Sequence, residues 1–447
     1  MGVRSIQVNS ERLSSQSTPA AATRDADARQ ALLEMLQAAI ASADPAKVLA
    51  AHLPSRPEGR CVVVGAGKAA ASMAAAVEAA WPDIPISGVV VAPHGYGARQ
   101  GRIVIREAGH PLPDESSILA ADEIISAVRG LEANDLVLAL ISGGGSAAMC
   151  LPVNSLTLED KRITNRLLLA SGLDIRTMNA VRRRISAIKG GKLAQAAAPA
   201  RVYTLAISDI PGDDPTAIAS GPTAPDSTWN SDLTGVIERL GPDLPPAVAA
   251  LLSRPGAQVD TSNASRVVLI STPAQALMAA GEAAARRGIK PVLLGDAIEG
   301  ESQAVARQMA MLTQPEATPV VFLSGGETTV TIGDKPFGKG GRNTEFLLSL
   351  ALELEGREDV WAIAADTDGE DGANLGAAGA ICGPGTIPRA RSLSIDPSYH
   401  LENHDSGSFF GQLGDLVITG PTRTNVNDFR AILILPPARR SKFPGEM

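Results

Sequence analysis

The chain has 447 residues, of which 45% are hydrophobic and 20% are charged, and its net charge at pH 7 is -8. This length predicts two domains, or one large domain with a substantial insertion, and the composition is typical of a soluble enzyme. The negative net charge argues against a nucleic-acid-binding protein, which needs a basic excess. No apolar run approaches the ~20 residues of a membrane span.

The first residues and the cysteines indicate where the protein works. Residues 1–27 are polar, lack the hydrophobic region of a secretory signal, and are expected to form a disordered tail. The three cysteines are isolated, which favours neither a disulfide framework nor a thiolate metal site. We therefore expect a cytoplasmic protein with no membrane partner and no nucleic-acid partner.

After a predicted amphipathic helix around Leu32 and Ile40, short hydrophobic runs alternate with helical patterns. Most of these runs are continuously apolar, as in strands that helices cover on both faces. This alternation predicts an α/β protein with a mostly parallel sheet. Residues 155–197 instead read as consecutive helices, and a loop-rich stretch places the domain boundary near residue 258, giving domains at 28–258 and 259–435. Ten runs are predicted strands: 61–67, 88–95, 103–109, 136–145, 202–214, 267–273, 291–297, 320–327, 361–372 and 416–425.

Polar and glycine-rich loops follow five of these strands, at the ends where open α/β sheets bind ligands. Glycines let main-chain N–H groups approach an anion, although the same glycines also serve tight turns. Several such loops in one chain favour phosphate binding over turns alone. The candidate phosphate-binding residues are Gly65, Gly67, Ser142, Gly143, Gly144, Gly145, Ser146, Ser324, Gly325, Gly326 and Glu327.

Lys68 separates two interpretations of the first loop, GAGKAA. The loop matches a variant of the dinucleotide fingerprint, which also needs an acidic residue after the second strand. That strand ends in Ala92-Pro93-His94, without a carboxylate. A cation at a helix N-terminus costs about 0.3–1 kcal/mol unless it meets an anion. We therefore expect Lys68 to contact a phosphate that is transferred, rather than to lie in solvent.

Other charged residues complete the candidate site. Asp209 follows one strand and Asp366 and Asp368 follow another, where carboxylates suit Mg²⁺ or, alternatively, cap turns and helices. Arg342 follows two glycines and is a candidate for stabilising transition-state charge, or else a surface arginine. Within the basic run 182–192, Arg182 and Lys189 are candidates for an anionic substrate, although such runs are usually solvated faces.

Nine stretches together resemble the glycerate 2-kinase family whose C-terminal part is the MOFRL domain. They lie between about residues 60 and 430 and include VVGAGKAA, GHPLPDESS, ISGGGSAAMCLP, SDIPGDDPTAIASGPTAPD, SGGETTVTI, GKGGRNTEF and GPTRTNVND. The resemblance implies two α/β domains, the first Rossmann-like, with the active site in the cleft between them. It also implies transfer of the γ-phosphate of ATP to the 2-hydroxyl of D-glycerate, with Mg²⁺, in glyoxylate, tartrate or serine-linked metabolism.

By this resemblance Lys68 and Arg342 match the proposed catalytic positions, with Asp366 and Asp368 as acidic partners. Asp209 or Asp366 would hold the metal or accept the hydroxyl proton, and a homodimer is left open. Members of the family have also been labelled hydroxypyruvate reductases, so NAD(P)H-dependent reduction of hydroxypyruvate is the alternative. A regulatory module that binds sugar phosphates is a third, but it would not need both aspartate clusters and Arg342.

Overall fold

The computed structural model describes residues 7–8, 19–333, 337–372 and 376–437, which divide into two compact units. Unit 1 contains the described residues up to Ser42, those of 273–422, and those from Asn427 onward. Unit 2 contains 43–272 and the short segment 423–426. Each unit has a sheet of its own.

The sheet of unit 2 has six strands in the order β4-β3-β2-β5-β6-β7, and all its neighbouring strands are parallel. Counted along the chain, this is the order 3-2-1-4-5-6 of a Rossmann fold. The prediction of a Rossmann-like domain with a mostly parallel sheet is therefore confirmed. The strands are β2 Cys61–Ala66, β3 Ile86–Pro93, β4 Val104–Ala108, β5 Leu136–Ile141, β6 Arg201–Ile207 and β7 Val268–Ser271.

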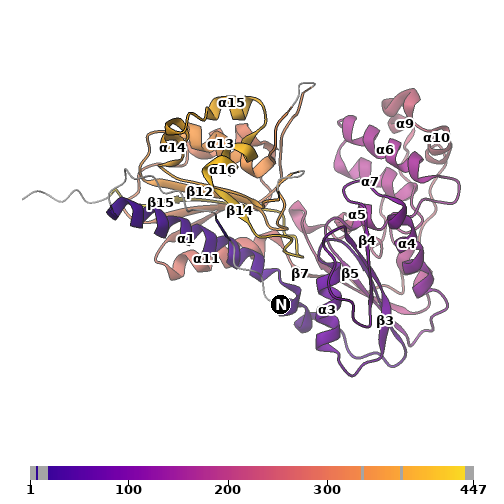
Figure 1. Ribbon diagram of the computed structural model, residues 1–447. Helices are drawn as coiled ribbons and strands as arrows, with labels where there is room; N and C mark the ends of the chain where they lie inside the picture. The colour runs from indigo at the N-terminus through magenta and orange to yellow at the C-terminus, as the bar shows by residue number, and fades with distance from the viewer. Residues whose placement is uncertain (1–6, 9–18, 334–336, 373–375, 438–447) are drawn as a thin grey trace, which may run out of the picture. The chain divides into compact units, whose positions relative to one another are not determined.

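Helices cover both faces of this sheet, which explains why its strands are apolar on both sides. Figure 1 shows α3 (Ala70–Ala80) and α4 (Glu115–Val128) on opposite sides of the strands. The main core joins α4 and α8 (Lys192–Ala197) to one face of β2 and β5. The remaining short elements of unit 2 near the sheet are α2 Pro45–Val48, η1 Leu49–His52, α5 Gly145–Ala148, η2 Pro211–Asp213 and η3 Ile218–Ser220.

Four further helices of unit 2 share a core of their own, built around Leu168, Val181, Leu240 and Leu252. Two of them, with α8, account for the helices expected within 155–197. The others fold from residues that the sequence suggested were rich in loops. These helices are α6 Leu158–Ala170, α7 Ile175–Arg184, α9 Thr234–Leu240 and α10 Pro246–Leu252, with a turn η4 at Gly241–Asp243.

The sheet of unit 1 is mixed and has the order β1-β14-β13-β12-β15-β10-β8. Only the β10–β8 pair is parallel among its described strands. All ten predicted runs contain strands, but β13, β15 and the two-residue strands β1, β9 and β11 were not predicted. The strands are β1 Gln7–Val8, β8 Lys290–Gly295, β10 Val320–Ser324, β12 Val360–Asp366, β13 Gly379–Cys382, β14 Leu416–Ile418 and β15 Asp428–Ile434; β9 Gly300–Glu301 and β11 Thr328–Thr329 form a separate pair.

Figure 1 shows α1 and α11 packed side by side on one face of the unit 1 sheet, with α13 to α16 on the other. The buried face of α1 includes Leu32, Met35, Leu36 and Ile40. Among the helices of the described residues, none combines the length and apolar character that crossing a bilayer demands. The helices are α1 Pro19–Ser42, α11 Pro273–Arg286, α12 Ser302–Ala310, α13 Arg342–Glu353, α14 Thr386–Ser392, α15 Pro397–Glu402 and α16 Ser406–Leu413.

The structure corrects two expected boundaries. Residues 1–6 and 9–18 of the expected tail lie outside the described residues, but 19–27 belong to α1, where Asp25 accepts hydrogen bonds from Arg29 and from the Trp361 indole. The units divide between Thr272 and Pro273 rather than at 258, because 259–272 include the sixth strand of the unit 2 sheet. The predicted first domain also included 28–42, which pack in unit 1.

Candidate active site

Two of the predicted loops lie side by side at the switch point of the unit 2 sheet. The strand order reverses between β2 and β5, and the loops that follow these neighbouring strands are GAGK and SGGGS. In open α/β sheets, ligands bind beyond the carboxyl ends of strands at this point. The topology therefore brings together two loops that are far apart in the sequence.

Hydrogen bonds join the two loops. Ser142 N–H donates to the Ala66 carbonyl (3.0 Å), and Lys68 N–H donates to the Gly143 carbonyl (2.8 Å). The buried Ser142 hydroxyl accepts a hydrogen bond from Ala69 N–H (3.0 Å), and so caps the N-terminus of α3. Among the described residues, no acceptor takes the N–H groups of Gly143 and Gly144. Those two groups are the ones that an anion could use.

Other predicted phosphate ligands have structural roles in unit 2. Gly65 lies inside β2, where a side chain would overlap the Leu140 carbonyl of β5. The Gly67 N–H donates to the Val91 carbonyl (3.0 Å), so this amide is already used. Gly145 begins α5, which has only four residues and adds little dipole to this loop.

Gly67 provides a direct test of how tightly the loops are joined. Its φ is +128°, and a Cβ at this position would overlap the Ser142 hydroxyl and carbonyl oxygens. We expect Gly67→Ala to lower the free energy of unfolding by about 1–3 kcal/mol, measured by urea denaturation.

Gly235→Ala is the matched control, since no atom lies within 4 Å of a Cβ there and the residue is in helix α9. Alanine should be neutral or slightly stabilising at that position. Equal stability of Gly67→Ala and the wild type would mean that the two loops are not held against each other.

Lys68 lies in the turn between β2 and α3, and its side chain is partly exposed. Its aliphatic stem passes over Gly144 of the second loop, because a Cβ on Gly144 would lie 3.3 Å from Lys68 Cγ. The ammonium lies 5.9 Å from the centroid of the Tyr96 ring. The stem of Lys68 thus lies against the SGGGS loop.

Asp209 follows β6 and reaches the same loop. Its carboxylate lies against the Cα of Gly143, where any side chain would collide with it, and it accepts a hydrogen bond from Asn425 Nδ2 (2.9 Å). Asn425 comes from the segment 423–426, which packs in unit 2. The sequence analysis did not select Asn425, because it lies at the end of a run assigned to another domain.

The basic run 182–192 is not a solvated face, because Arg183 and Lys189 are buried and its other basic residues are half-buried. Arg183 forms an ion pair with Asp226 (3.1 Å), and Lys192 donates to the main-chain carbonyls of Arg183 and Ser186. These two residues hold the local fold and have protein partners. The two residues predicted to bind substrate, Arg182 and Lys189, differ from them in their surroundings.

Lys189 connects this segment to the SGGGS loop. Its ammonium donates to the Ser146 carbonyl and hydroxyl oxygens, each at 2.7 Å. Burial, together with the positive charges of Lys161 and Arg182, holds the pKa of Lys189 well below its usual value. Arg182 makes two long hydrogen bonds to amide oxygens, at 3.4 Å to Asn165 and 3.3 Å to Asn179.

Arg342 is the centre of a second charged group, which lies in unit 1. As the first residue of α13, it forms ion pairs with Asp428 (2.9 Å), Asp366 (2.8 Å) and Glu327 (2.7 Å). Burial lowers the pKa of Arg342, but these three carboxylates outweigh it and raise the pKa well above its usual value. Glu327 was expected to bind phosphate, yet it is a carboxylate partner of Arg342 and would repel an anion.

Asp428 and Arg430 of β15 belong to this group and were missed. Asp428 is buried and accepts hydrogen bonds from Arg342, Asn343 (2.8 Å) and Arg430 (2.8 Å). β15 runs antiparallel to β12, so its first residue Asp428 pairs with Asp366, the last residue of β12. Polar residues directly before a hydrophobic run were the signal that would have identified them.

The remaining acidic residues of the DTDGEDG loop shape the backbone. Asp371 caps α13 by accepting from the N–H groups of Asn343 (2.9 Å) and Thr344 (2.8 Å). Asp368 is buried and accepts from Glu370 N–H (2.8 Å). This bond of Asp368 holds a turn, and the catalytic role expected for Asp368 stays a prediction.

The SGGE loop is also mainly structural. The Gly325 N–H donates to the Gly295 carbonyl (2.9 Å), and Gly326, with a φ of +106°, packs against the Ile298 backbone. Ser324 ends β10 and is buried, and a two-residue strand follows this loop instead of the expected helix. These contacts do not favour phosphate binding at this loop.

Among the described residues, no group of three His, Cys, Asp or Glu side chains could enclose a metal ion. Mg²⁺ does not need such a group, since it usually takes one or two carboxylates with waters and substrate phosphates. Asp209 fits this role because its carboxylate lies against Gly143 of the SGGGS loop. Asp366 fits less well, because its charge is already balanced by Arg342.

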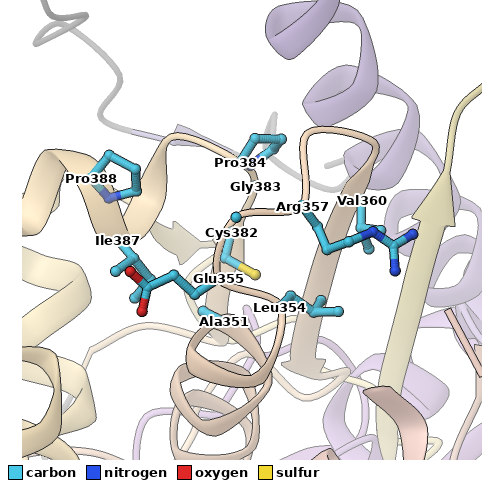
Figure 2. Close-up of a pocket in the computed structure, with 11 residues that line it drawn as sticks. Ala351, Leu354, Glu355, Arg357, Val360, Cys382, Gly383, Pro384, Ile387 and Pro388 are labelled. Atoms are coloured by element: carbon cyan, nitrogen blue, oxygen red, sulfur yellow. The ribbon is translucent and has the colours of Figure 1, made fainter. Parts of the chain in front are cut away.

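The cavity in Figure 2 is not a substrate site. It has a volume of about 20 Å³ and is lined mainly by α13, α14 and the loops beside them. That volume holds a single water, whereas small-molecule pockets measure ~300–1,000 Å³. Burial raises the pKa of the lining Cys382 thiol to about 12, so this cysteine is unreactive.

Comparison with known protein families assigns both parts of the chain. Residues 31–253 match a domain of unknown function, DUF4147, and residues 320–428 match the MOFRL family. An Agrobacterium vitis protein, named provisionally as a hydroxypyruvate reductase, is 53% identical over 92% of this chain and 95% of its own length.

Two further relatives carry kinase names. The glycerate 2-kinase of Pyrococcus horikoshii is 37% identical, over 90% of this chain and 96% of that protein. The crystal structure of glycerate kinase from Thermotoga maritima superposes with a TM-score of 0.81 at 34% identity, covering 92% of this chain and all of that one. By its motifs, its fold and these relatives, the chain belongs to the glycerate 2-kinase family and carries a MOFRL domain.

Proposed function

We propose that this protein transfers the γ-phosphoryl group of ATP to the 2-hydroxyl of D-glycerate, giving 2-phosphoglycerate and ADP. The C2 oxygen forms a bond to the γ-phosphorus while the bond from that phosphorus to the β,γ-bridging oxygen breaks. The observation that carries this proposal is the pair of loops joined at the Rossmann switch point, with Lys68 over Gly144.

Phosphoryl transfer requires neutralised charge and in-line positioning more than covalent chemistry. In the proposal, the Gly143 and Gly144 amides and Lys68 bind the phosphates, and the Arg342 guanidinium stabilises the charge of the transferred group. Asp366, Asp428 and Glu327 hold that guanidinium in one orientation. Because three carboxylates already fix the guanidinium, little energy is needed to reorient it when negative charge develops on the transferred group.

Mg²⁺ would neutralise charge on the phosphate oxygens when bound. Asp209 is the better candidate both for holding it and for accepting the proton of the C2 hydroxyl, because Asp366 is paired with Arg342. The metabolic setting is proposed to be the use of glycerate formed from glyoxylate, tartrate or serine, in the cytoplasm.

The test is the reaction itself. We expect ADP release that depends on D-glycerate and Mg-ATP, and NMR should identify the product as 2-phosphoglycerate. In a thermal-shift measurement ATP should stabilise the protein and NAD(P)H should not, since only a bound ligand stabilises by mass action.

Reduction of hydroxypyruvate is the second candidate, because a 53% identical relative bears that name. Two features disfavour it. The Gly67 and Lys68 amides, which would have to bind a pyrophosphate, donate to main-chain carbonyls of the protein. β3 is followed by His94, not by the carboxylate that would hold a ribose. Oxidation of NAD(P)H by hydroxypyruvate, without ADP release from ATP and glycerate, would replace the kinase proposal.

A further inference from the structure

Lys161, on helix α6, is a buried cation that neither the motifs nor the proposed mechanism uses. Its side chain is 2% exposed, and its ammonium makes no hydrogen bond of ordinary geometry to any residue in the described part of the chain. It lies beside the Cys150 thiol, and burial lowers its pKa. A buried ammonium without a partner is costly, so it is expected where a ligand supplies the missing charge.

Two other cations surround the same region. Lys161 lies close enough to Lys189 to depress the pKa of its ammonium, and Arg182 acts in the same direction. Their hydrogen bonds go to neutral oxygens of Ser146, Asn165 and Asn179. Three cations therefore gather in a buried region, and no carboxylate of the described residues pairs with any of the three.

This region contrasts with the other cations of the same helical segment. Arg183 pairs with Asp226, and the negative charge of Asp226 also acts on Lys192, which donates to two main-chain carbonyls. Arg183 and Lys192 thus have a carboxylate close by, whereas Lys161, Arg182 and Lys189 have no carboxylate partner among the described residues. We propose that these three residues form the subsite that receives the carboxylate of the hydroxy-acid substrate.

The place of the subsite agrees with that ligand. Lys189 binds Ser146, which belongs to the same loop as the Gly143 and Gly144 amides assigned to phosphate. In a 2-hydroxy acid, the carbon that bears the hydroxyl is bonded directly to the carboxylate carbon. A carboxylate held at Ser146 therefore brings the 2-hydroxyl toward the phosphate loop ahead of the 3-hydroxyl. This inference rests on the proposed function and explains its choice of hydroxyl.

Lys161→Met gives the test, because methionine fills the space of the stem and removes the charge. Without ligand, we expect the variant to melt about 2–4 °C higher than the wild type, since an uncompensated buried charge is gone. Stabilisation of the protein by D-glycerate, measured without nucleotide, should be lost. In the kinase assay the KM for D-glycerate should rise at least about tenfold, with the KM for ATP unchanged.

Lys192→Met is the matched control, because that buried lysine has protein partners. It should melt lower than the wild type and still bind D-glycerate. If Lys161→Met did not fold, Arg182→Gln would be measured in the same way. A lower melting temperature of Lys161→Met with an unchanged glycerate affinity would overturn the subsite.

Inorganic phosphate and glycerol are the comparison ligands. Loss of stabilisation by phosphate, but not by D-glycerate, would mean that the three cations hold a phosphate and would overturn the carboxylate assignment. Glycerol lacks the carboxylate, so its effect on the melting temperature should be the same for the variant and the wild type. Glycerate binding is measured without ATP, so this test of the subsite does not depend on the kinase reaction. Failure of the proposed kinase reaction would appear instead as a wild-type protein that shows no glycerate-dependent ADP release.

Discussion

Replacing Arg342 with alanine should lower kcat for glycerate phosphorylation by about 10²–10⁴-fold, with a much smaller change in the KM for glycerate. The guanidinium is proposed to stabilise charge that develops only in the transition state, and such contacts are worth roughly 3–5 kcal/mol in a site that excludes water. Steady-state kinetics of the purified variant measure this effect.

The surroundings of Arg342 add an effect on stability that its position in a glycine loop did not suggest. Removing it leaves Asp366 and Asp428 beside each other, with Arg430 as the remaining buried cation. We expect a loss of about 1–3 kcal/mol in the free energy of unfolding. Arg342→Lys keeps the charge and should fold normally, yet it should still lose most of kcat because an ammonium lacks the planar fork.

Arg357→Ala is the control for Arg342, since Arg357 also forms a two-point ion pair, with Asp359 (2.8 and 2.9 Å), but lies in another part of unit 1. It should keep kcat within about twofold. A folded Arg342→Lys protein with the kcat of the wild type would remove Arg342 from the mechanism.

Lys68→Ala should also lower kcat by about 10²–10⁴-fold, for a different geometric reason. The stem of Lys68 packs on Gly144, and the ammonium is proposed to bind the phosphates together with the Gly143 and Gly144 amides. Lys68→Arg should not restore the rate, because a bulkier planar group cannot follow the same path. Folding should be retained, because Lys68 lies in a partly exposed turn rather than in the core.

Lys47→Ala, at an exposed position in α2, is the control and should leave both kcat and stability unchanged. In the double variant Lys68→Ala/Arg342→Ala the losses should be less than additive, because both residues are proposed to act on one phosphoryl group. Fully additive losses would assign them to independent steps. A folded Lys68→Ala protein with normal kcat would make GAGK only a turn.

The parallel sheet of unit 2 could be predicted because its central strands β2 and β5 are buried along their whole length and are followed by glycine-rich loops. In unit 1 the same rule failed at β15, because its charged residue Asp428 is the first residue of the strand and does not follow the last one. An antiparallel strand brings its first residues to the edge where its neighbours end. Reading only the ends of strands therefore found Asp366 and missed its partner.

Burial was the other property that the sequence did not reveal. Lys161 stands in a helix with an ordinary polar pattern, and its 2% exposure depends on residues from other segments. The basic run 182–192 looked solvated for the same reason. Asn425 and the first helix were assigned to the wrong unit, because the chain returns to each unit after a long excursion.

The discontinuous course of unit 1 also sets the order in which the two units can assemble during synthesis. The apolar face of α1 emerges from the ribosome first, yet its partner α11 begins only at Pro273. All six strands of the unit 2 sheet lie between α1 and α11 in the sequence. That sheet can therefore fold on the ribosome while the apolar face of α1 is still uncovered. β15 ends at Ile434 and lies in the middle of its sheet, between β12 and β10. Unit 1 can therefore close only after β15 has been synthesised, and until then α1 is the segment that a chaperone would have to shield.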